Sequence, residues 1–257
     1  MVPLLETRKL SKYFGGIAAL RELDIHVNPG EILGLIGPNG SGKTTLFNVV
    51  TGFYRPTCGS VMFKGQSIGG KKPHQIAQMG IGRSFQLFNF FSSYNVLANL
   101  VMASYLEVKT GIWQSIVNSA ETRRKEKAVE DRAIEILKFV GLDEARDQLV
   151  ESLPHGYRKL LQLSIVLATN PELLLLDEPV SGMNQEEIGT MCDIIRKTRE
   201  LKKTIILVEH NMEVFMSLCD RIVVLNFGQK IAEGLPEEIR ANKDAVVAYL
   251  GSEEYVT

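Results

Sequence analysis

The sequence lacks several features that would each indicate a particular class of protein. Only 3 of its 257 residues are cysteines, and Cys58, Cys192 and Cys219 are isolated and without metal-binding spacing, which favours a reducing compartment and simple packing. The net charge of −1 provides no long-range attraction to nucleic acid. Basic residues are scattered apart from a mixed cluster at residues 121–127, which we interpret as a solvated helix face. We therefore expect no nucleic-acid partner.

Long apolar runs are absent as well. No stretch approaches the ~18 consecutive apolar residues of a membrane span, and the first nine residues lack the apolar core of a signal peptide. We expect no transmembrane segment, so any role at a membrane would come from docking onto another chain. An apolar content of 45% in 257 residues still suffices for a full core, in one domain with an insertion or in two small domains.

What the sequence does contain is a phosphate-binding loop. Residues 37–44, Gly-Pro-Asn-Gly-Ser-Gly-Lys-Thr, match the pattern G-x-x-x-x-G-K-[ST], between a predicted strand at 31–36 and a predicted helix from 45. In that order, backbone N–H groups and the positive end of a helix point at an anion. Lys43 can reach the β- and γ-phosphates, and the Thr44 hydroxyl can bind Mg²⁺. The alternative is a glycine-rich turn that binds nothing. The residues expected to hold the nucleotide are Gly37, Pro38, Asn39, Gly40, Ser41, Gly42, Lys43, Thr44 and Thr45.

A second motif places two carboxylates after an apolar strand. Residues 173–176 are four leucines, followed by Asp177 and Glu178. In an open parallel sheet, ligands bind outside the carboxyl ends of the strands. Asp177 is therefore placed to hold Mg²⁺, and Glu178 to polarise a water for in-line attack on the γ-phosphate. Taken alone, the same residues would fit a strand followed by a charged turn.

The order of the predicted elements indicates an α/β fold with a helical insertion. Short strands at 23–27, 58–65 and 81–86 give way to helical patterns, and α/β alternation returns with strands at 173–176, 204–208 and 222–225. Continuous apolar strands between helices predict a mostly parallel sheet covered on both faces. We expect a P-loop NTPase core of residues 1–86 and 164–257 with an antiparallel β part near the N-terminus. Residues 87–163 would form a helical subdomain.

The chain resembles the nucleotide-binding subunits of ABC transporters nearly from end to end. The phosphate loop, Ser84-Phe85-Gln86, the helical insert, Asp177-Glu178 and Val208-Glu209-His210 come in that family's order. The resemblance implies that Gln86 senses Mg²⁺ and the attacking water and links the core to the transmembrane partner. It implies that His210 contacts the γ-phosphate. Glu178, His210 and Gln86 would be the catalytic residues, and Thr44, Gln86 and Asp177 the Mg²⁺ site.

The resemblance also implies an adenine-stacking ring near the start of the chain. Lys12-Tyr13-Phe14-Gly15-Gly16 matches that loop, and a flat ring there can stack on the base. Phe14, directly before the glycines, is the favoured residue. Tyr13 is the alternative, and both rings could instead belong to the core.

Two segments depart from the family pattern. The usual signature Leu-Ser-Gly-Gly-Gln faces the phosphate loop of a second subunit, and the matching residues here are Leu153, Pro154, His155, Gly156 and Tyr157. Pro154 has no hydroxyl, so the side-chain hydrogen bond of the usual serine is lost. We expect the contact in trans to persist through helix polarity and the Gly156 N–H. The second departure is Asn184 in Ser181-Gly182-Met183-Asn184, where many members have aspartate.

In these two segments the sequence resembles the subset of subunits that serve branched-chain amino-acid importers. The implied function is ATP hydrolysis by a subunit peripheral to the inner face of the cell membrane, with ATP and Mg²⁺ bound between two nucleotide-binding subunits, identical or sister chains. Transmembrane permease subunits would dock on the helical insert, where Phe88, Phe90, Phe91 and Tyr94 are either core or docking surface. Alternatives are a subunit for urea or another small solute, a non-transport ABC-type switch, and a regulatory subunit of weak activity.

Overall fold

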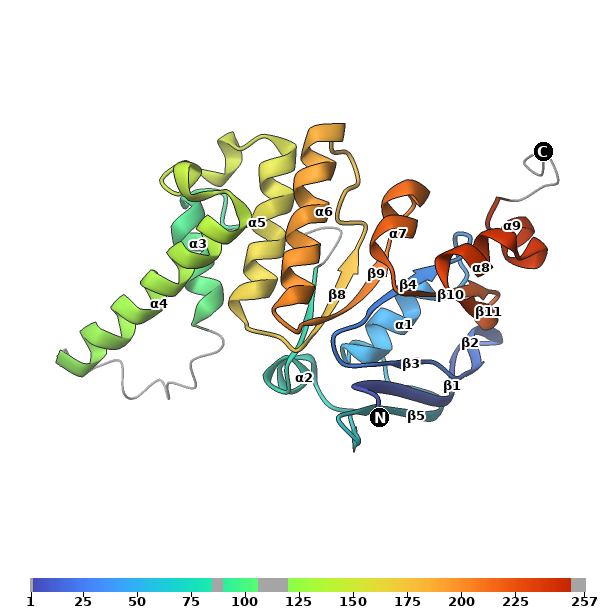
Figure 1. Ribbon diagram of the computed structural model, residues 1–257. Helices are drawn as coiled ribbons and strands as arrows, with labels where there is room; N and C mark the ends of the chain where they lie inside the picture. The colour runs from blue at the N-terminus through green and yellow to red at the C-terminus, as the bar shows by residue number, and fades with distance from the viewer. Residues whose placement is uncertain (1, 85–89, 106–119, 251–257) are drawn as a thin grey trace.

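The centre of the fold is a mixed sheet in which apolar strands run mainly parallel (Figure 1). The computed structural model describes residues 2–84, 90–105 and 120–250. Within these residues six strands form this sheet in the order β11-β10-β4-β9-β8-β7. Their bounds in that order are Gln229–Gly234, Arg221–Asn226, Ile32–Ile36, Thr204–Val208, Leu173–Asp177 and Ile81–Arg83. All neighbouring pairs are parallel except β10 with β11, which are antiparallel.

The strands of this sheet are apolar throughout because both faces are covered. Successive side chains of a strand point to opposite faces, so Leu174 and Leu176 pack into one cluster of buried residues and Leu173 and Leu175 into another. The first cluster contains residues of helices α5 (His155–Ala168), α6 (Gln185–Glu200) and α7 (Met212–Leu218). The second contains residues of α1 (Lys43–Val50) and of the other sheet. This explains the continuous leucine run of β8.

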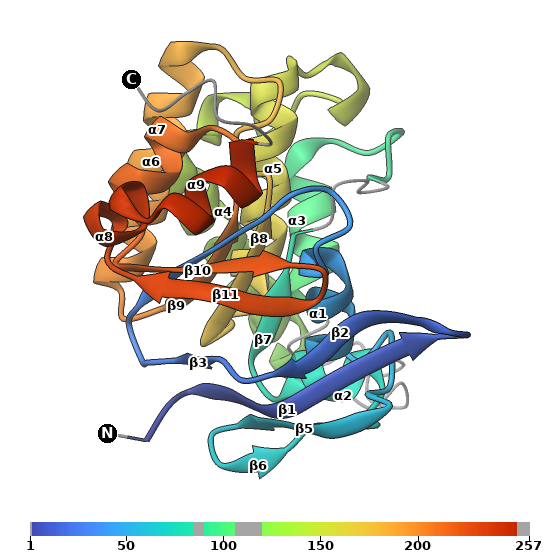
Figure 2. The ribbon, with the colours of Figure 1, turned by 90° about the vertical axis from the view of Figure 1, so that its right-hand side faces the viewer.

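A separate antiparallel sheet lies against α1 near the N-terminus (Figure 2). Among the described residues it contains five strands, β1, β2, β3, β5 and β6, with bounds Leu5–Phe14, Ile17–Leu23, His26–Val27, Cys58–Phe63 and Gln66–Ser67. The order is β2-β1-β5-β6, and β3 also pairs with β1. Helix α2 (Pro73–Gln78) then leads to β7. The α/β fold with a mostly parallel sheet and an N-terminal antiparallel part is therefore confirmed.

The helical insertion extends to one side of the sheet (Figure 1). It contains α3 (Val96–Ser104), α4 (Ala120–Val140) and the short 3-10 turns η2 (Asp143–Ala145) and η3 (Val150–Ser152). Val129, Ala133 and Val140 of α4 are buried, as their helical spacing predicts. Helix α5 runs across residue 163 and packs against α3, α4 and β7. The division of the core at residues 163 and 164 stays a prediction.

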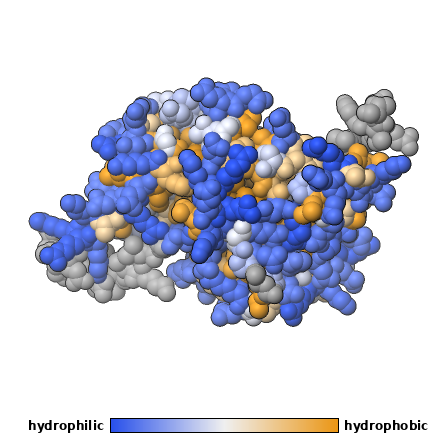
Figure 3. Space-filling view, viewed as in Figure 1, coloured by the Kyte–Doolittle hydropathy of each residue, from blue (hydrophilic) through white to orange (hydrophobic). Residues whose placement is uncertain are grey.

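The last two helices among the described residues, α8 (Pro236–Ala241) and α9 (Lys243–Leu250), lie beside β11. Hydrophilic side chains dominate the face seen in Figure 3, and hydrophobic residues show between them in patches. Across the described ranges, no helix combines the length and the apolar character needed to cross a membrane.

Candidate nucleotide site

Three motifs of the sequence follow three adjacent strands. The phosphate loop follows β4, Asp177 is the last residue of β8, and His210 follows β9, in a sheet where the order is β4-β9-β8. Because these strands are parallel, their carboxyl ends meet at one edge, where ligands of open α/β sheets bind. Residues that are up to about 170 positions apart in the chain thus share one site.

The phosphate loop is too tightly packed for a side chain at two of its glycines, Gly37 and Gly42. A Cβ on Gly37 would lie 2.0 Å from the backbone oxygen of Leu225, and one on Gly42 would lie 2.7 Å from the backbone oxygen of Ala19. Gly42 has a φ of 110° and immediately precedes α1, a conformation that L-residues rarely adopt. Ser41 is buried. The loop is therefore a preformed cradle of backbone groups at the start of a helix.

Lys43 occupies this cradle with its own ammonium group. Its Nζ donates to the carbonyl oxygens of Gly37 at 2.7 Å and Pro38 at 3.0 Å. Burial lowers the pKa of Lys43, and the carboxylates of Asp177 and Glu178 oppose that shift. Phosphate oxygens would offer the same ammonium stronger, charged acceptors. Around it, Asn39, Gly40 and Thr44 are exposed, and Pro38 and Thr45 are half-buried.

Asp177 is buried and paired with an arginine that the sequence did not single out. Asp177 Oδ2 lies 3.2 Å from Arg83 Nη2, and both side chains are only 6% exposed. Arg83 Nη1 also donates to Asn48 Oδ1 of α1 at 2.6 Å. Burial raises the pKa of Asp177, and Arg83 acts in the opposite direction. The backbone N–H of Asp177 donates to Ser84 Oγ at 3.1 Å, so the residue that follows β7 helps to hold the backbone of Asp177 in place.

The oxygen groups at this edge suit Mg²⁺ bound together with phosphates. Among the described residues, no group of three or more His, Cys, Asp or Glu side chains could hold a metal ion alone. Mg²⁺ is commonly bound by one or two carboxylates together with substrate phosphates and water. Asp177 and the exposed Thr44 hydroxyl fit that pattern. Gln86, the third expected ligand, lies outside the described residues.

Glu178 and His210 are brought together. Their side chains form a contact of 2.9 Å between Glu178 Oε1 and His210 Nε2, with Glu178 22% and His210 47% exposed. Glu178 has a φ of 50°, and its backbone N–H donates to the carbonyl oxygen of Val208 at 2.9 Å. A partly exposed carboxylate next to an imidazole is well suited to orienting a water molecule.

Glu209 is a buried carboxyl group whose importance could not be judged from sequence. It is 3% exposed, and its Oε2 has no hydrogen-bond partner in the part of the chain that the structure describes. Burial, assisted by Glu178, raises the pKa of Glu209 to about 7. Its position between Val208 and His210 was the available signal, but a carboxylate after an apolar strand usually lies in solvent.

The expected adenine-stacking residue lies at the end of β1 and is accessible. Phe14 is 42% exposed and Tyr13 38%, which excludes both rings from the core. The Phe14 ring makes an edge contact with Tyr54, with 5.1 Å between centroids, and Lys12 Nζ lies 4.9 Å from the Phe14 centroid. Tyr54 thus supports Phe14 from one side, a contact that the sequence did not predict.

The signature segment forms the start of α5. Leu153 and Gly156 are buried, while Pro154, His155 and Tyr157 are exposed. Pro154 immediately precedes the first helical residue, His155, where its missing N–H leaves no unsatisfied donor. The segment therefore presents a helix N-terminus to solvent, as its expected contact in trans requires.

Asn184, the second departure, caps helix α6. Its Oδ1 accepts from the Glu187 N–H at 3.0 Å, and Glu187 Oε2 accepts from the Asn184 N–H at 2.9 Å. Asparagine and aspartate serve this capping role about equally. The change from aspartate therefore leaves the local helix start intact.

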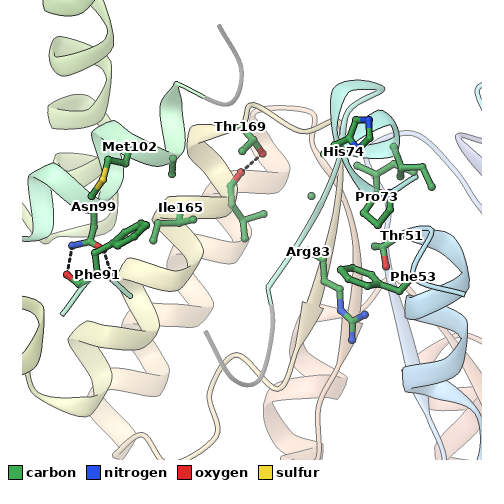
Figure 4. Close-up of a pocket in the computed structure, with 16 residues that line it drawn as sticks. Thr51, Phe53, Pro73, His74, Arg83, Phe91, Asn99, Met102, Ile165 and Thr169 are labelled. Atoms are coloured by element: carbon green, nitrogen blue, oxygen red, sulfur yellow. Dashed lines mark hydrogen bonds between the residues drawn. The ribbon is translucent and has the colours of Figure 1, made fainter. Parts of the chain in front are cut away.

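An apolar groove of about 530 Å³ separates the helical insertion from the core (Figure 4). Phe53, Pro73 and Arg83 line it from the core side, and Met102 and Ile165 from the side of α3 and α5. Of the four aromatic residues expected there, Phe88 lies outside the described residues, and Phe90 packs partly buried against the core. Phe91 and Tyr94 are exposed by 59% and 53%.

Comparisons with known proteins identify the family. Residues 20–181 match the ABC transporter family model, and residues 229–255 match the model of the branched-chain amino acid ATP-binding cassette transporter. The chain is 39% identical over 250 residues to the high-affinity branched-chain amino acid transport ATP-binding protein LivG of Escherichia coli K12, covering 97% of this chain and 98% of that protein. It is 37% identical to BraF of Pseudomonas aeruginosa, which has the same description, with the same coverage.

Comparison with solved structures points to the same family. The ADP conformation of MJ1267, an ATP-binding cassette of an ABC transporter, superposes with a TM-score of 0.84 at 29% identity, covering 98% of this chain and 100% of that one. The likeness extends through the antiparallel part, the sheet and the helical insertion. The chain therefore belongs to the ABC transporter family, as one of its ATP-binding and ATP-hydrolysing subunits.

Proposed function

We propose that this subunit powers the uptake of branched-chain amino acids across a membrane. The names of LivG and BraF support this solute class over urea or another small solute, as does the match of residues 229–255 to the branched-chain model. The same names and the same family match favour a role in transport over a non-transport switch. The observation that carries the proposal is the meeting of Lys43, Asp177, Glu178 and His210 at one sheet edge.

In this proposal the phosphates of ATP lie in the cradle of residues 37–45 and replace the carbonyl oxygens that Lys43 now contacts. Thr44, Asp177 and Gln86 would hold Mg²⁺, which neutralises phosphate charge when bound. Glu178 orients the attacking water and accepts its proton, and His210 holds Glu178 and reaches the γ-phosphate. Phe14 stacks on the adenine.

A second nucleotide-binding subunit completes each site. Residues 153–157 of one subunit would close over the phosphate loop of the other, with the Gly156 N–H and the N-terminus of α5 directed at the phosphate. Such reciprocal sites require a two-fold arrangement, formed with an identical or a sister chain. Nucleotide binding would thereby draw two surfaces together and supply the mechanical step.

The apolar groove is where a short helix of the permease would dock. It is flanked by the exposed rings of Phe53 and Phe91, and clustered exposed aromatic rings are common at interfaces between proteins. Since no helix among the described residues spans a bilayer, this contact would hold the subunit to the inner face of the cell membrane. The helical insertion would then pass nucleotide-driven movement to the permease.

The test uses the subunit reconstituted in proteoliposomes with the permease that co-purifies with it and the matching solute-binding protein. ATP hydrolysis should rise with that solute, and labelled leucine, isoleucine or valine should enter the vesicles. E178Q should retain ATP binding, lose turnover and trap a dimer of nucleotide-binding subunits. Unchanged hydrolysis in E178Q would remove Glu178 from the mechanism, and uptake of urea alone would overturn the solute class.

A further inference from the structure

The N-terminal part of α5 contacts the loop after β8 through two side chains. Lys159 Nζ donates to the backbone carbonyl of Glu178 at 3.0 Å. His155 Nε2 lies 3.1 Å from the carbonyl oxygen of Ser181, and because a carbonyl oxygen can only accept, His155 is the donor. Residues four positions apart lie on the same face of a helix. His155 and Lys159, which we call the α5 clamp, therefore hold both ends of residues 178–181.

Glu178 needs support of this kind because its backbone is in an unfavourable conformation. A φ of 50° lies in the left-handed region, which is unfavourable for a residue with a side chain, and such conformations persist where the surroundings enforce them. Here the Glu178 N–H donates to Val208 on β9 and its carbonyl accepts from Lys159. Both backbone groups are thereby held while the carboxylate contacts His210.

The charges around Lys159 favour its placement. The side chain is half-buried, and burial lowers its pKa, whereas the carboxylates of Glu209, Glu178 and Asp177 oppose that shift. Three acidic groups thus attract the ammonium toward the base of the loop. The carbonyl of Glu178 lies in the same region and receives its hydrogen bond from this cation.

Helix α5 also packs closely against the loop after β8 and against the start of α6. A Cβ on Gly156 would lie 2.3 Å from Glu187 Oε1, and a Cβ on Gly182 would lie 2.9 Å from His155 Nε2. His155 replaces a glycine of the family pattern, and Asn184, the other departure, caps the helix that begins with this loop. Glu187, which forms the cap with Asn184, is thus the residue that packs against Gly156, next to His155.

We propose that Lys159 and His155 are positioning residues that hold Glu178 in its active backbone conformation from the helix that faces the partner subunit. This inference rests on the proposed reciprocal dimer. There, the N-terminus of α5 faces the nucleotide of the second subunit while its clamp holds the general base of the first. A nucleotide that moves this turn would therefore adjust hydrolysis at the other site.

The experiment compares K159M, K159R and the matched control R158M in the full-length subunit with its permease, measuring kcat, KM for ATP and affinity for ADP. Arg158 is a neighbouring exposed cation that donates to Glu151 instead, so R158M should keep its kcat. K159M should lower kcat about 10- to 100-fold, because a small displacement of a catalytic group has this effect, with KM and ADP affinity changed less than about twofold. K159R should recover most of the loss, and H155A should act in the same direction as K159M.

A double-mutant cycle separates positioning from general damage. Because Lys159 acts through Glu178, K159M should change the residual single-turnover rate of E178Q by less than about twofold. An equal loss in both backgrounds, or a K159M kcat equal to that of the wild type, would overturn the clamp. If K159M fails to fold, K159Q, which retains a neutral hydrogen-bond donor, is measured instead. A kcat of K159Q close to that of the wild type supports the hydrogen bond, and a kcat reduced about 10-fold or more refutes it. If E178Q turns over normally, the proposed function fails; if E178Q is inactive while K159M is normal, only the clamp fails.

Discussion

Replacing Arg83 by methionine should destabilise the fold through the charge that it leaves behind. Arg83 and Asp177 are both 6% exposed and lie 3.2 Å apart. Removing one partner of a buried ion pair leaves an uncompensated charge and costs about 3–5 kcal/mol. Methionine keeps much of the side-chain volume but removes the guanidinium that lies over the ring of Phe47. The lost free energy of unfolding should therefore come mainly from electrostatics.

Urea unfolding followed by circular dichroism measures this effect in the nucleotide-free protein. R83M should lose about 3–5 kcal/mol, and adding D177N, which removes the unpaired charge at nearly constant volume, should recover at least about 2 kcal/mol of that loss. The matched control is R196M, whose pair with Asp193 has a similar separation of 3.1 Å but is 47% and 66% exposed. It should cost no more than about 1 kcal/mol. Equal losses in R83M and R196M, or no recovery with D177N, would refute the reasoning.

Three further predictions concern the nucleotide site. Because burial raises the pKa of Glu209 from 4.5 to about 7, the folded protein holds a proton that the unfolded chain releases between these values. The free energy of unfolding should fall as pH rises through this range, by at most about 3 kcal/mol. In urea unfolding, E209Q should lack this decrease with pH. The same dependence of the unfolding free energy on pH in E209Q and the wild type would contradict the prediction. G37A, whose Cβ would meet a backbone oxygen at 2.0 Å, should abolish ADP binding in calorimetry, while G65A, in an open turn, should not. F14A should weaken ADP binding about 5- to 100-fold through lost stacking and F14Y should not; an unchanged affinity would assign the stacking to Tyr13.

The parallel strands of the central sheet and the motifs could be predicted because they depend on local patterns, whereas the strands β1 and β11 were not predicted. A four-leucine run between turn signals is typical of a strand buried on both faces, and the glycine spacing of residues 37–44 has few uses other than binding phosphate. The contacts of Arg83 and Lys159 could not be predicted, because a cation inside a strand or helix gives no sign of whether it faces solvent or a carboxylate brought from far along the chain. His155 was seen only as a departure from a pattern. Its partner Ser181 depends on how α5 and the loop after β8 pack in three dimensions.

Helix α5 is long enough to connect two separate sites. Its 14 residues make a rod of about 20 Å. One end carries the segment expected to touch a neighbour's triphosphate, and the other supplies Ile165 and Val166 to the apolar groove. A hydrogen-bonded helix hardly stretches or compresses, so a push on either end must appear at the other as a tilt or a slide. Movement at the nucleotide site of the partner subunit and movement at the apolar groove would then be transmitted through this one helix, in both directions.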